Sequence, residues 1–272
     1  MIDRLLDPIV RRLLRPRPPV ARALSDDLRS FADDVTIEGR GPMRGWYLAR
    51  DARARGVVLV VHGWGSDAGR SSGLARSLLD EGLAVLLIDL PGHGRSGPAP
   101  SYDVPRMLDD IGAARRWLSS REEVRDRRPG LIGISFGGVG AYAAASRDPS
   151  WAALALLAAP MGPLEASGLY LQAKGVPAAL RSTMLRSVGR VLALDGRGYR
   201  GVECLANVHS PVLIVHGTDD RVVPLAHAEA LASSPSAGER EVHWVQGGGH
   251  DLTDDAATGA RIARFFARAL AN

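Results

Sequence analysis

The sequence is poor in cysteine, lysine and aromatic residues. Cys204 is the only cysteine among 272 residues, so the chain can form no intramolecular disulfide and offers no cysteine-based metal site. A lone cysteine fits a reducing compartment, and we expect a cytoplasmic protein. No apolar run approaches the roughly 20 residues that a membrane-spanning helix needs. Lys174 is the only lysine, so nearly all the positive charge comes from arginine.

The charge pattern argues against a nucleic-acid partner. The formal net charge is only +4, and the arginines are scattered among acids rather than gathered on one face with interleaved aromatic residues. The seven histidines show no H-x-x-x-H or other metal spacing, so we expect no metal site. We therefore expect neither a nucleic-acid partner nor a cofactor.

Residues 1–33 read as an N-terminal arm with a linker. Asp3, Asp7 and several arginines interrupt the apolar positions, so a secretory signal is not expected. Pro8 should kink or restart the helix, and prolines within residues 16–19 end it. The apolar positions follow the spacing of one helix face, and they are Ile2, Leu5, Leu6, Ile9, Val10, Leu13 and Leu14.

The arm has an apolar face with no assigned partner. We expect this helix to pack on its own chain or on a twin subunit, and a homodimer contact through the arm is a reasonable hypothesis. The alternative is a basic helix that lies on a membrane surface through residues 2–14. The arm's acids, however, leave only a weak basic face for anionic lipid.

From residue 34 to residue 272 the pattern is that of one α/β domain. Two short polar-bounded strands come first, and then buried apolar strands alternate with helical patterns, which predicts a mostly parallel twisted sheet with helices on both faces. The expected strands are 34–39, 43–49, 56–63, 83–90, 129–135, 151–160, 210–217 and 240–247, and the expected helices are 69–82, 107–121, 136–148 and 260–272.

One long connection breaks this alternation. Residues 161–208, here named the cap segment, contain helical pieces and no convincing strand. The segment is far longer than an ordinary connection between a strand and the next one. We interpret it as a small helical cap inserted between two late strands beside the site. The alternative is a structural insertion away from the site.

The stretch GISFGG carries the strongest chemical signal. Gly133, Ser135 and Gly137 match G-x-S-x-G between an apolar strand and a helical pattern. A serine on such a strained turn is displayed as a nucleophile, and the glycines avoid a clash where strand and helix crowd together. The stretch resembles the nucleophile elbow of the α/β-hydrolase family. The resemblance covers about residues 34–272.

A serine nucleophile needs a base and an acid that orients the base. His250 stands on a glycine-rich loop directly after the last expected strand. The stretch VHGTDD supplies Asp219 and Asp220 after the strand before it, and the family pattern, which places the acid three residues after Gly217, selects Asp220. The order of serine, aspartate and histidine is the order that the family uses.

Two backbone N–H groups should hold the oxyanion in acyl transfer. Phe136, the first residue after the serine, provides one. The stretch HGWGS after the third strand resembles the HG-x-G segment of the family, which implies that Trp64 provides the other.

The stretch GHGRSG at residues 92–97 matches G-x-G-x-x-G, a dinucleotide-binding pattern. Two prolines follow at once, so no helix starts there and cofactor binding is not expected. The stretch instead looks like a structural loop familiar in α/β hydrolases.

The resemblance implies a serine hydrolase with a Ser-acyl intermediate, formed by Ser135, His250 and Asp220. We expect a small-molecule carboxylic ester or thioester as the substrate. A peptidase, an amidase, an acyltransferase and a non-hydrolytic binding or signalling protein of the same fold are the alternatives. Peptidase relatives often carry a cap acid for a free amine, for which Glu165 and Glu203 are candidates.

The apolar residues of the cap segment suit an acyl chain. We expect substrate contacts from Trp64, Leu164, Leu169 and Tyr170. The segment is also rich in arginine, which raises the hypothesis of an anionic substrate group. Its apolar residues are Leu164, Leu169, Tyr170, Leu171, Val176, Leu180, Met184, Leu185 and Val188, and its basic residues are Lys174, Arg181, Arg186, Arg190, Arg197 and Arg200.

Overall fold

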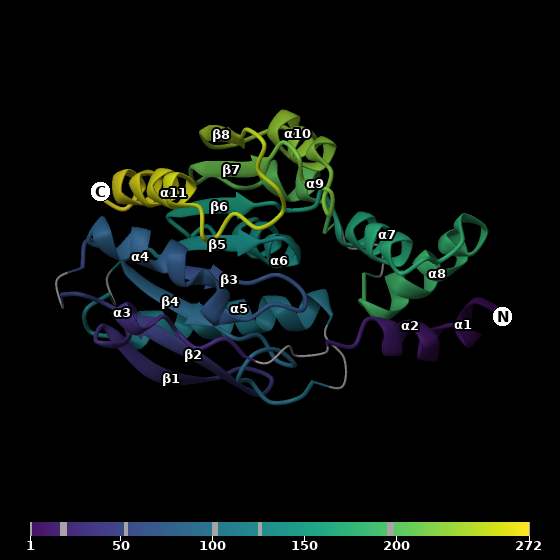
Figure 1. The fold of residues 1–272 in the computed structure, drawn as a ribbon, viewed down its shortest axis with the longest axis horizontal. Helices are drawn as coiled ribbons and strands as arrows, with labels where there is room; N and C mark the ends of the chain where they lie inside the picture. The colour runs from purple at the N-terminus through teal and green to yellow at the C-terminus, as the bar shows by residue number, and fades with distance from the viewer. Residues whose placement is uncertain are drawn as a thin grey trace.

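A computed structural model describes residues 2–16, 21–51, 54–99, 103–124, 127–194 and 199–271. Eight strands form one sheet in the order β1-β2-β4-β3-β5-β6-β7-β8 (Figure 1). β2 runs antiparallel to both of its neighbours, and the strands from β4 to β8 are parallel. The strands are β1 (Ala32–Glu38), β2 (Pro42–Leu48), β3 (Val57–Val61), β4 (Ala84–Ile88), β5 (Gly130–Ile134), β6 (Ala153–Leu157), β7 (Val212–Gly217) and β8 (Arg240–Val245). The predicted α/β architecture is confirmed.

Helices cover both faces of the sheet because the central strands are apolar on both faces. Val58 and Val60 of β3 pack with α4 (Ser72–Asp80) and α11 (Ala256–Ala269). Val57, Leu59 and Val61 pack on the other face, with α5 (Val104–Ser120) and α6 (Phe136–Ala145). This alternation along one strand produces two separate core layers.

Some helix positions differ from the expectation. The last helix begins at Ala256, four residues early, because the Asp255 side chain caps it by accepting the Thr258 N–H (2.7 Å). The expected helix over 69–82 is a 3₁₀ turn, η1 (Ala68–Ser71), followed by α4. The structure also adds α10 (Leu225–Ser233) and the short α3 (Asp26–Arg29), which were not expected.

The N-terminal arm forms two short helices, α1 (Ile2–Leu5) and α2 (Asp7–Leu13). Pro8 is the second residue of α2, so the helix restarts at the proline as expected. Val10 is fully buried and Leu14 is nearly so, because α2 packs against α8 (Ala178–Val191). The arm therefore packs on the cap segment of its own chain.

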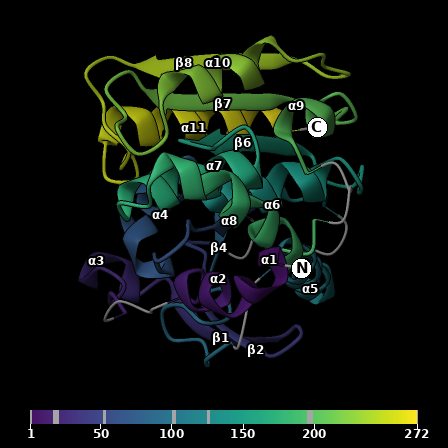
Figure 2. The ribbon, with the colours of Figure 1, turned by 90° about the vertical axis from the view of Figure 1, so that its right-hand side faces the viewer.

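The cap segment holds α7 (Pro163–Ala173), α8 and α9 (Gly201–Leu205). α7 and α8 pack on each other, and together with α1 and α2 they lie at one end of the molecule, opposite α11 (Figure 1). Figure 2 looks onto that end. α9 packs instead against α6 and α10, so the end of the segment lies on the body of the domain. Across the described ranges, no helix combines the length and apolarity that a bilayer crossing needs.

Candidate active site

The site lies where the strand order reverses. β3 and β5 are parallel neighbours, yet β4 lies on the far side of β3. The loops that follow β3 and β5 therefore leave the sheet in diverging directions and open a crevice at the carboxyl ends of the strands. The first of these loops carries Trp64, and the second carries Ser135.

Ser135 sits in the strained conformation that the sequence pattern predicts. Its φ is 51° and its ψ is −123°, a region that side-chain-bearing residues rarely adopt. A Cβ on Gly133 would lie 2.5 Å from Ala141 Cβ, and a Cβ on Gly137 would lie 2.4 Å from the His62 carbonyl oxygen. Both glycines are therefore needed where β5, α6 and the loop after β3 crowd together.

The structure brings Ser135, His250 and Asp220 together from three separate loops. The Ser135 hydroxyl donates to Nε2 of His250 (3.0 Å), and Nδ1 of His250 donates to Oδ2 of Asp220 (2.8 Å). Asp220 is buried and His250 is partly exposed. Asp219 points away and its side chain accepts from Thr218. Of the two adjacent aspartates, only Asp220 can orient the histidine.

A second histidine, His216, holds the Asp220 carboxylate from the other side. Nε2 of His216 donates to the Val223 carbonyl (2.8 Å) and lies 3.3 Å from Oδ2 of Asp220. The N–H groups of Val222 and Val223 donate to Oδ1. Burial raises the pKa of Asp220, but the hydrogen bonds from His216 and His250 outweigh burial and leave this pKa well below its usual range. His216 was missed in the sequence, where its position inside β7 resembles that of a core residue.

The loop after β3 is held against Ser135 by a buried histidine. Nδ1 of His62 donates to the Gly63 carbonyl (2.7 Å), and Nε2 accepts the Leu90 N–H (3.0 Å). Burial lowers the pKa of His62 to about 4. A Cβ on Gly63 would lie 2.9 Å from Ser135 Cβ, so the loop passes directly beside Ser135.

Trp64 lies on the loop after β3, and Phe136 directly follows Ser135. Their rings meet edge to face with centroids 5.6 Å apart. Phe136 begins α6, so its N–H is among those that have no acceptor within the helix. Trp64 directly follows Gly63 on the adjacent loop.

The GHGRSG stretch packs beside the loop after β3 and does not open a helix. Asp89, at the end of β4, accepts the Ala68 N–H (2.7 Å) and the Arg95 N–H (3.1 Å). Gly94 has a positive φ, and a Cβ there would strike Asp89. The next helix, α5, begins only at Val104. These bonds give the stretch a structural role beside the site.

A cavity of about 500 Å³ lies above Ser135. Trp64, Leu169 and Tyr170 line it as expected, but Leu164 does not, and its side chain is exposed. The face of α7 that meets the cavity recurs every three or four residues, through Ala166, Leu169, Tyr170 and Ala173, and Leu164 lies off this face. The lining residues are Leu14, Trp64, Ser135, Phe136, Pro160, Ala166, Ser167, Leu169, Tyr170, Gln172, Ala173, Leu192, Arg221, Val222, Val223 and His250.

Leu14 of the arm is an unexpected part of this cavity. The Tyr170 hydroxyl donates to the Leu13 carbonyl (3.2 Å), which ties the end of the arm to α7. No signal in the sequence connects Leu14 with residues more than 120 positions away. The arm thus contributes one wall of the cavity.

The charged residues of the cap segment have other partners. Arg190 pairs with Asp7 (2.7 Å), and Arg200 lies near Glu165 (3.4 Å). Arg197 lies outside the described residues. The arginine that lines the cavity is Arg221, from the loop after β7. None of the cap arginines that the structure describes is among the residues that line the cavity. Within the described ranges, no cluster of His, Cys, Asp and Glu is placed to hold a metal ion.

The doubly wound sheet, the strained serine at its switch point and the facing histidine and aspartate define an α/β hydrolase. The family model for serine aminopeptidases of type S33 matches residues 52–197, more than half of the chain. The protein therefore belongs to this family of α/β hydrolases.

Individual relatives agree with this assignment. An uncharacterized protein of Mycobacterium tuberculosis is 32% identical over 232 residues, covering 80% of this chain and 72% of the relative. A monoacylglycerol lipase of Mycolicibacterium smegmatis is 25% identical over 238 residues, covering 75% and 84% of the two chains. The structure of a Pyrococcus furiosus esterase superposes with a TM-score of 0.69 at 21% identity, covering 93% and 98%, and so shares the fold.

Proposed function

We propose that this protein is a serine esterase that hydrolyses carboxylic esters with an apolar acyl group. The observation that carries the proposal is the chain of hydrogen bonds from Ser135 through His250 to Asp220, placed at the floor of a largely apolar cavity. The names of two relatives, a monoacylglycerol lipase and an esterase, support the same chemistry.

The reaction follows from the order of these groups. The Ser135 oxygen attacks the ester carbonyl while Nε2 of His250 takes the hydroxyl proton. The negative charge that develops on the carbonyl oxygen is held by the N–H groups of Trp64 and Phe136. His250 then passes its proton to the departing alcohol, which leaves an acyl group on Ser135. Water, deprotonated by His250, releases the acid and regenerates the serine.

Asp220 acts on His250 rather than on the ester. Its carboxylate fixes the tautomer in which Nδ1 carries the proton, so Nε2 is left free to accept. It also stabilises the imidazolium that forms after proton transfer. The hydrogen bonds from the Val222 and Val223 N–H groups and the contact with His216 hold the Asp220 carboxylate in place.

The cavity favours an ester over a peptide with a free amino terminus. A free amine needs a buried or facing acid, and no Asp or Glu belongs to the described lining of the cavity. Glu165, one candidate for that role, instead lies beside Arg200. Thioesters share the same carbonyl chemistry and are the second candidate substrate.

The direct test is hydrolysis of p-nitrophenyl esters from acetate to palmitate. We expect Ser135→Ala to lower turnover by roughly 10⁴-fold or more, and Asp220→Asn to lower it by about 10⁴-fold because the histidine tautomer is no longer fixed. Asp219→Asn is the matched control, and it should retain wild-type turnover.

Two results would contradict the proposal. Equal turnover by wild type and Ser135→Ala would show that another group carries the reaction. Tight ligand binding without turnover, and without labelling of Ser135 by a fluorophosphonate, would place the protein among non-hydrolytic members of the fold.

A further inference from the structure

Exposed apolar side chains gather at one end of the molecule. We name the surface of α1, α2, α7 and α8, with the turn between α7 and α8, the arm–cap face. Most of the large apolar side chains that the described structure leaves exposed lie on it or at the adjoining rim of the cavity, whereas Val242 lies on the edge strand β8. The members at this end are Leu5, Ile9, Leu164, Leu180 and Val222, with Leu5 72% exposed. Single exposed apolar residues are ordinary, but a cluster marks an interaction surface.

The turn between α7 and α8 forms an apolar tip on this face. Residues 172–180 are exposed except for Val176, which is partly buried, and most of them are apolar. Lys174 and Arg181 stand at the two sides of the tip. An apolar tip between basic side chains is the pattern of a segment that enters the boundary between lipid headgroups and acyl chains.

The face also holds the positive charge of the whole protein. Within its helices and the turn, residues 2–13 and 163–191, there are seven basic residues and three acidic ones, whereas the whole chain has 34 and 30. The rest of the chain therefore carries equal numbers of basic and acidic residues. The basic residues of the face are Arg4, Arg11, Arg12, Lys174, Arg181, Arg186 and Arg190.

Tertiary contacts pair two of the three acids of this face, Asp7 and Glu165. Asp7 accepts from Ser187 and from Arg190 (2.7 Å), and these hydrogen bonds lower the pKa of Asp7 to about 2. Glu165 lies beside Arg200. Asp7, one of the two acids that weaken the basic face of the arm as an isolated helix, is thus already paired within the protein, and the face keeps an excess of basic residues.

The mouth of the cavity opens beside this face. Gln172 and Ala173, at the exposed end of α7, line the cavity, and so do Arg221 and the 56% exposed Val222. We propose that the arm–cap face docks on an anionic membrane surface and that docking brings the mouth of the cavity to the lipid. Apolar burial holds the tip in the interface, and the arginines supply attraction to anionic headgroups.

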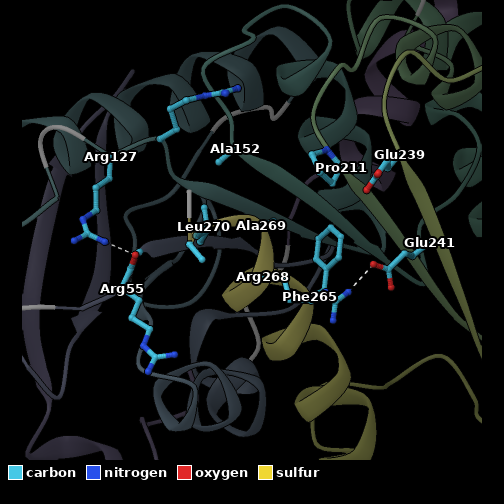
Figure 3. A pocket seen from close by; sticks show the side chains of 13 residues that line it. Arg55, Arg127, Ala152, Pro211, Glu239, Glu241, Phe265, Arg268, Ala269 and Leu270 are labelled. Carbon is cyan, nitrogen blue, oxygen red and sulfur yellow. Dashed lines mark hydrogen bonds and ion pairs between the residues drawn. The ribbon is translucent and has the colours of Figure 1, made fainter.

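The opposite end of the molecule also carries arginines, but it lacks the exposed apolar side chains of the arm–cap face. A hollow of about 1020 Å³ at the amino ends of the strands is lined by Arg55, Arg127 and Arg268, among others. Glu239 and Glu241 line the same hollow, and Glu241 pairs with Arg268 (Figure 3). This hollow has arginines but none of the exposed large apolar side chains, so it provides a matched control.

The experiment measures flotation of full-length Ser135→Ala protein with vesicles. The lipids are phosphatidylcholine alone or phosphatidylcholine mixed with phosphatidylglycerol. Because this protein cannot consume an ester through Ser135, the result does not depend on the proposed function. We expect binding to the mixed vesicles that weakens as salt is added.

Variants locate the contact. Each basic residue near an anionic surface contributes roughly a fivefold factor in binding, so Arg11→Gln with Arg12→Gln should weaken binding by at least about tenfold. Leu5→Ser with Ile9→Ser should weaken it by roughly tenfold through lost apolar burial. The control, Arg55→Gln with Arg127→Gln, should leave binding unchanged. Circular dichroism confirms that the variants are folded. Hydrolysis of a short ester, measured with the same substitutions in protein that retains Ser135, provides a second check.

Three results would overturn the proposal. One is equal binding to the two kinds of vesicle, and another is an equal loss in the control variant. The third is a dimer in solution that Leu5→Ser with Ile9→Ser dissociates, because the face would then belong to a second copy of the chain.

Discussion

Histidines perform three different tasks around Ser135. His250 accepts a hydrogen bond from the Ser135 hydroxyl, His216 contacts the Asp220 carboxylate, and His62 holds the loop beside the serine. The difference comes from burial and partners. His62 is completely enclosed and accepts a backbone N–H, so it must stay neutral, whereas His250 reaches partly into solvent.

The buried His62 makes the stability of the protein depend on pH. Its pKa falls from 6.5 to about 4 on folding. Between these two pH values the His62 side chain binds a proton in the unfolded chain but not in the folded chain. Stability is therefore fully present above about pH 6.5 and is lost as the pH falls toward 4. We expect His62 to account for roughly 3 kcal/mol of this loss, with His93, whose pKa burial lowers to about 3, adding to it.

The measurement is urea unfolding at several pH values between 7 and 4.5. Wild type should lose free energy of unfolding steeply over this range, and His62→Gln should show a clearly flatter dependence. Parallel curves for the two proteins would show that His62 does not carry the effect.

Among the elements, α7 supplies one wall of the cavity above Ser135. One face of this helix, through Ala166, Leu169, Tyr170 and Ala173, meets the cavity. Leu164 lies on the same helix but faces outward. The sequence shows that α7 contains apolar residues, but its apolar positions run nearly all round the helix, so the lining face could not be selected from the pattern alone.

This difference predicts the behaviour of two tryptophan variants on one helix. Leu169→Trp should fill the cavity and shift the preferred p-nitrophenyl ester toward shorter chains, with kcat/KM for the longest ester reduced roughly tenfold or more, since one to two kcal/mol of apolar contact is lost. Leu164→Trp should keep the wild-type preference. If both variants shift it equally, the cavity does not extend along this face of α7.

In the whole molecule, the arm packs on the cap segment, and both of them line the cavity above the sheet. The arm carries Leu14 into the cavity, and Val10 anchors it on the cap segment. The catalytic candidates stand on loops of the sheet and do not need the arm for their positions. Detaching the arm should therefore alter substrate preference more than turnover.

Val10→Asp tests this separation because a buried charge without a partner expels the helix. We expect kcat/KM for long-chain esters to fall by about tenfold through loss of the Leu14 contact, while kcat for acetate stays near wild type. Ile9→Asp, at the exposed neighbouring position, should change neither ester. A matching loss of acetate turnover in Val10→Asp would mean that the arm supports the sheet as well as the cavity.

The arm is helical, and its packing on the cap segment changes how the charge of Asp7 is interpreted. In the sequence, Asp7 counts against a lipid surface. In the structure, the Asp7 carboxylate accepts hydrogen bonds from Arg190 and Ser187 of α8. No local pattern links residue 7 with residue 190, because such a pair depends on how the cap segment folds back over the sheet. The homodimer through the arm stays a prediction.

The eight strands, the turn that carries Ser135 and the order of Ser135, Asp220 and His250 could all be predicted from local sequence patterns. These features depend on local requirements: apolar runs form buried strands, and only glycine fits beside a serine at a crowded strand-to-helix turn. The position of Leu14 in the cavity wall and that of Leu164 outside it became apparent only in the folded chain, because they depend on how the arm and the cap segment pack over the sheet. The contact of His216 with Asp220, four residues later, depends on the turn after β7, which brings the two side chains together.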